Sequence, residues 1–134
     1  MSVLVTDTGF QPAPTDSFVT LADIASHQGA VDLAHTDDPE ALAPYLASLT
    51  LIRVNFPAFS DGRAFTIARR LRALGFTGTL RAHGPVIADQ YPMARRVGFD
   101  AVEIPDDIAA RQPESQWLNR ANWQAHDYLA RLKA

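Results

Sequence analysis

A polar corner separates an apolar run from a helical pattern in the segment "NFPAFSDGRAF". Ser60 and Asp61 can accept hydrogen bonds from the free N–H groups of the following helix, and a carboxylate there also suits the helix dipole. Gly62 lets the backbone approach a ligand closely, and Arg63 places a positive charge where it opposes the dipole. Helix N-termini and arginine forks both bind anions, so this corner is either a structural cap or a site for an anion or a partner.

A second corner, "HGPVIADQYP", repeats this arrangement further along the chain. Asp89 can cap the helix that follows, with Gln90 beside it. His83 comes just before a Gly-Pro pair and is expected at the mouth of a loop, where a histidine can act as a base or as a ligand. The three other histidines have no acidic or histidine partner at metal-site spacing, so no metal is predicted.

The elements around these corners follow a repeated pattern. "LTLIRVNF" is typical of a buried strand, because apolar and β-branched residues run almost without a break. From Arg63 the period changes to about 3.6, which predicts a helix. Its apolar face consists of Ala64, Ile67, Ala68, Leu71 and Leu74. Gly75 ends this helix, since glycine readily adopts positive φ just past a helix. A strand in "TGTLRAHG", a second helix ending at Gly98 and a strand in "DAVEIP" complete a βαβαβ unit over residues 49–104.

Strands joined by helices in this way run parallel, with right-handed crossovers. A closed barrel of eight such units takes about 200 residues or more, and the chain has 134. The predicted fold is therefore α/β, with a small parallel sheet that is open or half-barrel-like. Ligands of such sheets bind beyond the carboxyl ends of the strands. We expect one rim to gather the polar residues that follow the strands, namely Ser60, Asp61, Arg63, His83, Asp89, Gln90 and Glu103.

The two ends of the chain are less regular. We predict one domain over residues 1–134, with its core over 31–104. "SVLVT" is consistent with a short edge strand, and the rest of residues 1–30 is left open. Asp38 is expected to cap a helix that Pro39 begins and Pro44 kinks. Residues 105–134 predict a helical tail whose amphipathic stripe packs on this domain or on a second subunit, so a homodimer is one alternative. The stripe consists of Trp117, Ala121, Ala125, Tyr128 and Leu132.

Composition argues against several classes of function. The net charge of −3 argues against a nucleic-acid-binding protein, which needs a basic face. The chain has no cysteine, which excludes disulfides, thiol redox chemistry and cysteine-ligated clusters. No G-x-G-x-x-G follows a strand and no Walker loop is present, so no nucleotide or other cofactor is predicted. No apolar stretch approaches the roughly 20 residues that span a bilayer, so we expect a cytoplasmic protein without membrane contact.

The central segment resembles a known bacterial family. A Phe-x-Asp-Gly-Arg corner, a Gly-Phe helix end, a Leu-Arg-Ala-x-Gly strand, an Asp-Gln helix start and a Gly-Phe-Asp-Ala ending are similar to motifs of the family called domain of unknown function 934, over about residues 38–104. The resemblance implies that the characteristic positions are Asp61, Gly62, Arg63, Arg81, Gly84, Asp89, Gln90 and Glu103. Members are labelled oxidoreductases of sulfite reduction because they are encoded beside assimilatory sulfite reductase.

These observations lead to three hypotheses. The first is an accessory protein of assimilatory sulfite reduction that binds a small anion or a partner, with sulfite reductase as the partner that the resemblance implies. The second is an oxidoreductase that uses a flavin or another organic cofactor through an unrecognised site. The third is a dimeric scaffold. We prefer the first, because the sequence offers no thiol and no nucleotide loop for electron transfer.

Overall fold

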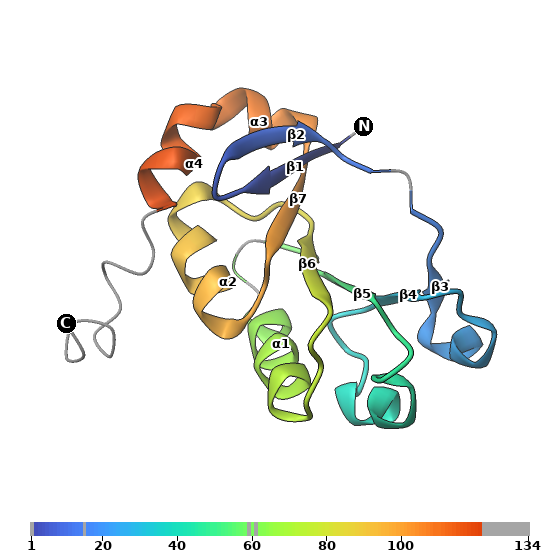
Figure 1. Cartoon of the computed structure of the whole chain (residues 1–134). Coiled ribbons are helices and arrows are strands. Elements are labelled where there is room, and N and C mark those ends of the chain that lie inside the picture. The colour runs from blue at the N-terminus through green and yellow to red at the C-terminus, as the bar shows by residue number, and fades with distance from the viewer. Residues whose placement is uncertain (1, 15, 59, 61, 122–134) are drawn as a thin grey trace, which may run out of the picture.

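The computed structural model describes residues 2–14, 16–58, 60 and 62–121. One sheet of seven strands runs through it in the order β2-β1-β7-β6-β5-β4-β3 (Figure 1). The strands are β1 (Ser2–Thr6), β2 (Gly9–Pro12), β3 (Val19–Thr20), β4 (Ala30–Leu33), β5 (Leu51–Asn55), β6 (Thr79–His83) and β7 (Ala101–Pro105). The α-helices are α1 (Arg63–Ala73), α2 (Tyr91–Val97), α3 (Asp106–Arg111) and α4 (Glu114–Arg120). The 3₁₀ helices are η1 (Leu21–Ser26), η2 (Pro39–Tyr45) and η3 (Ala88–Gln90).

The sheet is mostly parallel, which confirms the predicted α/β class. Strands β3 to β7 pair in parallel with their neighbours, and β1 runs antiparallel to both β2 and β7. The prediction that residues 2–6 form an edge strand is wrong, because β1 lies between β2 and β7. A tight turn at Gly9, where φ is +119°, folds β2 back on β1 and makes β2 the edge.

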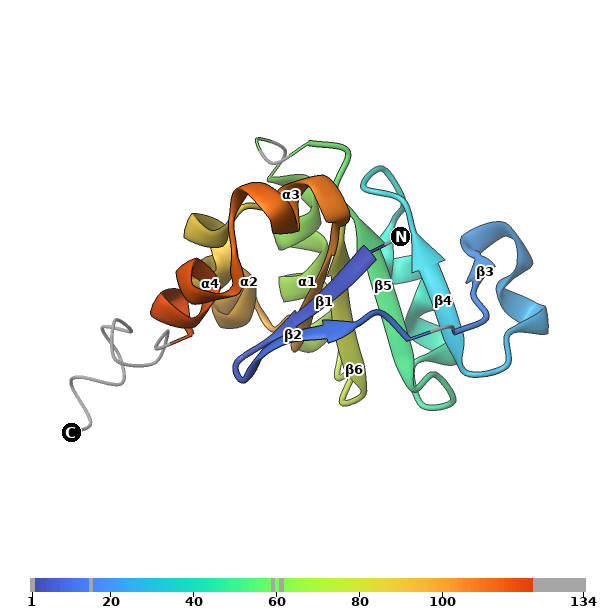
Figure 2. The ribbon, with the colours of Figure 1, turned by 90° about the horizontal axis from the view of Figure 1, so that it is seen from above.

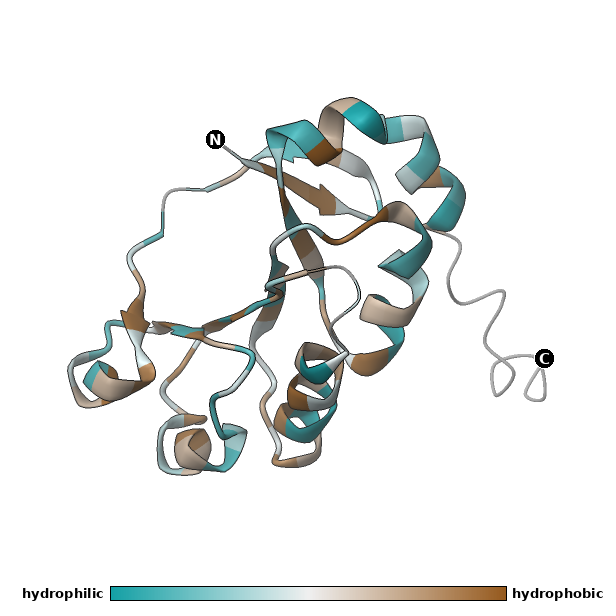
Figure 3. Cartoon of the chain, turned by 180° about the vertical axis from the view of Figure 1, so that it is seen from behind, coloured by the Kyte–Doolittle hydropathy of each residue, from teal (hydrophilic) through white to brown (hydrophobic). Residues whose placement is uncertain are grey.

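The curved sheet has a convex face and a concave face that are covered differently. Helices α1 and α2 lie on the convex side (Figures 1 and 2). Alternate strand residues form the buried core. They are Val31, Leu33, Ile52, Val54, Leu80, Ala82, Val102 and Ile104. Helix α1 buries Ala64, Ile67, Ala68 and Leu71, four of the five residues of its predicted apolar face. The hydropathy colouring shows brown segments along the strands, interrupted by teal ones, and teal segments on the outer sides of the helices (Figure 3).

Helix boundaries follow the predicted signals closely. Gly75 and Gly98 have φ of +102° and +116°, just past the ends of α1 and α2. Asp38 caps the next element as expected, by accepting a hydrogen bond from the backbone N–H of Glu40 at 2.9 Å. That element is a 3₁₀ helix rather than an α-helix, and it contains Pro44, which has no N–H to donate to an α-helical ladder.

The tail begins with two short helices rather than one long one. Trp117 of α4 is buried, donates its indole N–H to the carbonyl of Gln112 at 2.9 Å and packs edge-on against Tyr91 of α2. The first residue of the predicted stripe therefore packs on this domain. Ala125, Tyr128 and Leu132 lie outside the described residues. None of the described helices has the length and apolar character needed to cross a membrane.

The concave face is crossed by the segment that joins β2 to β3, whose described residues 13, 14 and 16–18 we call the strap (Figure 2). Its described residues reach the sheet through two side chains. Asp16 bonds to Arg81, and the Phe18 ring lies under the guanidinium group of Arg53. The strap thus brings residues from near the N-terminus over the centre of the parallel sheet.

Candidate functional site

Charged residues form a row across the concave face. Asp32, Arg53 and Arg81 are register partners on β4, β5 and β6. Successive side chains on a strand point to opposite faces of the sheet. The apolar residues before and after each member of this row are buried in the core, so the row points to the other face. A parallel sheet covered on both faces is usually apolar throughout. This sheet departs from that rule on one face, which marks the row as a candidate site.

A second polar row lies nearer the carboxyl ends of the same strands. Asn55, His83 and Glu103 are register partners on β5, β6 and β7. His83 Nδ1 lies 2.6 Å from Asn55 Oδ1, and His83 Nε2 lies 3.4 Å from Glu103 Oε2. The two rows together form the concave-face cluster, which consists of Asp32, Arg53, Asn55, Arg81, His83 and Glu103.

Arg53 is bonded to two carboxylates of the concave-face cluster. Its Nε and Nη2 donate to the two oxygens of Asp32 at 2.9 and 2.5 Å, and its Nη1 donates to Glu103 at 3.2 Å. The guanidinium carbon lies 4.1 Å from the centre of the Phe18 ring. The Asp32 hydrogen bonds raise the pKa of Arg53 although burial opposes them, so this arginine stays charged.

Arg81 is buried and incompletely bonded. Its side chain is 7% exposed. Its Nη1 donates to Glu103 Oε1 at 3.3 Å and its Nη2 donates to Asp16 Oδ2 at 3.2 Å. Its Nε is buried with no hydrogen-bond partner in the described part of the chain. Buried polar groups are nearly always hydrogen-bonded, so we expect this nitrogen to donate to an acceptor that is not among the described residues.

Glu103 joins the two arginines. It accepts hydrogen bonds from Arg53, from Arg81 and from the Ser2 hydroxyl, the last at 2.9 Å. Burial acts to raise the pKa of Glu103, but the Ser2 hydrogen bond and the neighbouring positive charges hold it below its ordinary value. Burial and the charge of Arg53 lower the pKa of His83. At neutral pH the site therefore holds a carboxylate beside a neutral imidazole.

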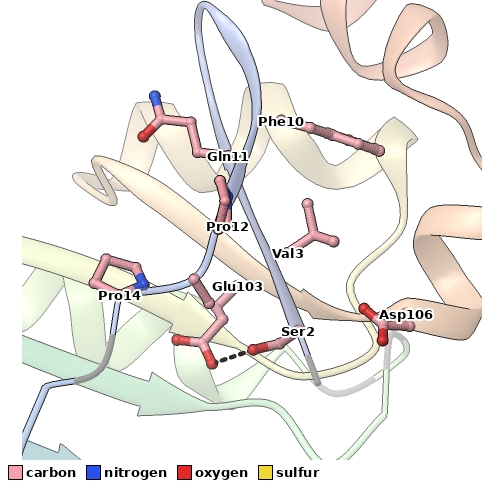
Figure 4. Close-up of a pocket in the computed structure, with 9 residues that line it drawn as sticks. Ser2, Val3, Phe10, Gln11, Pro12, Pro14, Glu103 and Asp106 are labelled. Atoms are coloured by element: carbon pink, nitrogen blue, oxygen red, sulfur yellow. Dashed lines mark hydrogen bonds between the residues drawn. The ribbon is translucent and has the colours of Figure 1, made fainter.

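A cavity of about 600 Å³ opens next to this cluster. Glu103 and Ser2 face each other on one side of it, and Phe10 and Val3 lie across from them (Figure 4). The strap and the end of β2 add Pro12, Ala13 and Pro14, and Asp106 closes the far end. Its volume falls in the range of small-molecule sites, about 300–1,000 Å³. A smaller cavity of about 370 Å³ has Asp32 and Asn55 in its wall, near β3.

The structure brings together only part of the predicted rim. Arg81, His83 and Glu103 meet in the cluster. Ser60, Gly62 and Arg63 lie exposed at the start of α1. Asp61 lies outside the described residues, so its predicted role as a helix cap is not described.

The second corner is built differently from the prediction. Gln90, not Asp89, reaches back to the start of its helix, where its Oε1 accepts from the N–H of Ile87 at 3.2 Å. Asp89 Oδ1 instead accepts from Arg120 of α4 at 2.7 Å. The longer side chain can turn back to the helix start, while the shorter carboxylate extends outward to a partner that is distant in sequence.

Sequence reasoning missed Asp32, Arg53, Asn55, Asp16 and Ser2. A signal for some of them was present, because the strands "LIRVN" and "LRAH" alternate apolar with polar residues. Such alternation indicates that one strand face is polar. Asp16 and Ser2 give no comparable signal, since their contacts depend on the path of the strap and of β1.

The fold and the cluster define an α/β protein with a charged, partly covered sheet face. Residues 30–128 match the family described as bacterial protein of unknown function, DUF934, and the chain belongs to this family. The matched range contains the whole concave-face cluster but not Ser2 or Asp16. Neither the curated proteins nor the solved structures contain a match. Among the described residues, no group of three or more histidine, aspartate or glutamate side chains is placed to hold a metal ion.

Proposed function

We propose that this protein is an accessory binding module of sulfite reduction whose concave sheet face binds a small oxyanion such as sulfite. The observation that carries the proposal is Arg81. Its terminal nitrogens hold Glu103 and Asp16, while its Nε is buried without an acceptor in the described residues. Leaving such a donor unbonded costs about 1–3 kcal/mol. An oxyanion that accepts from Nε would recover this free energy.

Asp16 occupies the position that such an anion would take. Nε and Nη2 lie on one edge of a guanidinium group, and two oxygens of one oxyanion can accept from both. Asp16 accepts only from Nη2, and its side chain is 35% exposed on the strap. An oxyanion would make one more charge-assisted bond to Arg81 than Asp16 does. It would therefore displace Asp16 from Arg81 when the strap moves aside. Arg53, the register partner of Arg81, adds a second positive charge.

NMR of the arginine Nε–H groups during addition of sodium sulfite tests the proposal. We expect the Arg81 resonance to shift and to saturate. Arg81→Lys keeps the charge and loses Nε, so sulfite affinity should fall about tenfold, as expected for the loss of one charge-assisted hydrogen bond. The matched control is Arg111→Lys on α3, whose side chain is 70% exposed and pairs with Asp107. An Arg81 resonance that does not move, or equal losses in both variants, would refute anion binding at this site.

The accessory role has a separate test. Tagged wild-type protein from the host, grown on limiting sulfate, should co-purify with sulfite reductase subunits. Absence of those subunits under conditions where the enzyme is expressed would argue against the partnership and would leave the anion site untouched.

The cavity of about 600 Å³ favours a second candidate, an organic cofactor or substrate. Its walls are mainly apolar, with Phe10, Pro12 and Pro14 near the buried carboxylate of Glu103 (Figure 4). Such walls suit a flat or aliphatic molecule better than a small anion. The absorbance spectrum of protein purified from its host tests this candidate, since stoichiometric flavin bands would favour the oxidoreductase hypothesis.

A further inference from the structure

His83 Nε2 and Glu103 Oε2 face each other as two hydrogen-bond acceptors when the ring is neutral. The orientation of the Asn55 amide causes this arrangement. The amide nitrogen of Asn55 donates to Asp32 Oδ1 and to the carbonyl of Leu33, both at 3.1 Å. These two acceptors fix the orientation of the amide, so its Oδ1 is the atom that faces His83 Nδ1 at 2.6 Å. An amide oxygen only accepts, so Nδ1 must carry a proton.

This bond fixes the tautomer of the neutral imidazole. With the proton on Nδ1, the Nε2 atom carries a lone pair. Nε2 lies 3.4 Å from Glu103 Oε2, which belongs to a carboxylate held by Ser2, Arg53 and Arg81. Two acceptors at this separation repel each other unless a donor group or a proton lies with them.

The groups around His83 act on its pKa in opposite directions, and the net effect favours the neutral ring. On the neighbouring strands, Arg53 and Arg81 disfavour a proton on the ring, and Asp32 and Glu103 favour one. Burial adds to the effect of the arginines, so the pKa of His83 lies below its ordinary value. On the strap, Asp16 is bonded to Arg81 rather than to the ring. The His83 side chain is nevertheless 34% exposed, so a small ligand can reach it.

We propose that His83 Nε2, backed by Glu103, accepts the O–H proton of a weak-acid oxyanion bound beside Arg53 and Arg81. The inference rests on the proposed function, since the arginines must hold that anion. The O–H bond of the ligand breaks and its electron pair stays on the ligand oxygen, while an N–H bond forms at Nε2. The imidazolium then faces the Glu103 carboxylate, and the added negative charge of the ligand faces the two guanidinium groups. Asn55 acts as a positioning residue by holding the ring.

Inorganic phosphate and sulfate form a matched pair of probes, because they share a shape and only phosphate carries a proton near neutral pH. The imidazole nitrogens of ¹⁵N-labelled wild-type protein are followed by NMR, one pH unit above the pKa measured for free His83, where the ring is about 90% neutral. We expect a proton on Nδ1 alone in the free protein, and on both nitrogens with saturating phosphate. Calorimetry in two buffers should show no net proton uptake per bound phosphate, since the proton that reaches Nε2 comes from the ligand.

An unprotonated Nε2 in phosphate-saturated protein would overturn the inference, as would uptake of one proton from the buffer with each bound phosphate. If the Arg81 Nε–H resonance shifts with phosphate while Nε2 stays unprotonated, only this inference fails. If phosphate, sulfate and sulfite all leave the Arg81 Nε–H resonance unchanged, both this inference and the proposed function fail.

The role of Asn55 is tested with Asn55→Ala, and Asn119→Ala on the exposed side of α4 is the control. Asn55→Ala should give a neutral ring that populates both tautomers and should weaken phosphate binding about tenfold. Asn119→Ala should change neither property. A ring that keeps its proton on Nδ1 in Asn55→Ala would show that another group fixes the tautomer and would refute the positioning role.

Discussion

Replacing Glu103 with glutamine should cost a large part of the stability of the domain. The carboxylate is 7% exposed and accepts from Ser2, Arg53 and Arg81. Glutamine keeps the volume, but its amide nitrogen is a donor that faces guanidinium donors, so the arginines lose an acceptor and a counter-charge. Breaking a buried ion pair from one side costs about 3–5 kcal/mol. Asp32 and Asp16 remain as partners of the arginines, so we expect about 3 kcal/mol, the low end of this range.

Urea and thermal unfolding followed by circular dichroism measure this cost. A loss of about 3 kcal/mol corresponds to a fall in Tm of about 10 °C for a domain of this size. The control is Glu40→Gln, which removes an exposed partner of Arg70 and should change stability by less than about 0.5 kcal/mol. A loss below about 1 kcal/mol in Glu103→Gln, or one equal to that in the control, would refute the view that this network is buried and cooperative.

The pH dependence gives a second readout of the same prediction. The pKa of Glu103 is lowered in the folded protein, so the unfolded state binds its proton more readily. The stabilisation is therefore fully present above the ordinary pKa of 4.5 and is lost as the pH falls through the folded value. The stability difference between wild type and Glu103→Gln should be constant above about pH 5.5 and shrink in more acidic solution. A difference that persists unchanged at about pH 3 would mean that charge is not its cause.

Three further predictions concern the turn, the strap and the histidine. Gly84→Ala should destabilise by more than about 2 kcal/mol, because φ is +138° and the new Cβ would lie 2.2 Å from the carbonyl of Phe56. Gly62→Ala should not, because no heavy atom of the described residues beyond its chain neighbours lies within 4 Å of the new Cβ; equal Tm values for the two variants would contradict this. Asp16→Asn should leave Tm within about 2 °C of wild type and raise sulfite affinity in calorimetry, since a competing charge is removed; a lower affinity would count against displacement. Because the pKa of His83 is lowered, urea midpoints should fall as the pH drops below about 6.5 and should fall less in His83→Gln.

The sequence predicted best what depends on local periodicity. The apolar face of α1 and its end at Gly75 follow from a period of 3.6 and from the conformational freedom of glycine, and both appear in the structure. The parallel pairing of β5 with β6 follows from the helix between them. Even the paired residues of β5 and β6, such as Ile52 and Leu80, are only 28 positions apart, so local signals and the fold agree here.

The candidate site was only partly predictable because its residues are far apart in the sequence. The corner at Gly62 and Arg63 is a compact motif that is visible in the sequence. The cluster is instead built by residues that alternate along strands and by Asp16, which lies 65 positions from its partner Arg81. Local patterns carry no information about such a contact. The polar alternation in "LIRVN" and "LRAH" was the available clue, and it lies in strands that a parallel sheet would normally make apolar.

The charged residues of the concave face are paired with one another and with the strap, and these pairings differ in how firmly they are held. Two guanidinium groups, of Arg53 and Arg81, meet three carboxylates, of Asp32, Glu103 and Asp16. Asp32 and Glu103 are held by the sheet itself, and each has several bonds. Asp16 belongs to the strap and holds Arg81 by one bond to one nitrogen. Under the proposed function, an external anion would have to displace only this last, partly exposed carboxylate, and the bonds of Asp32 and Glu103 would keep the arginines in place during the exchange.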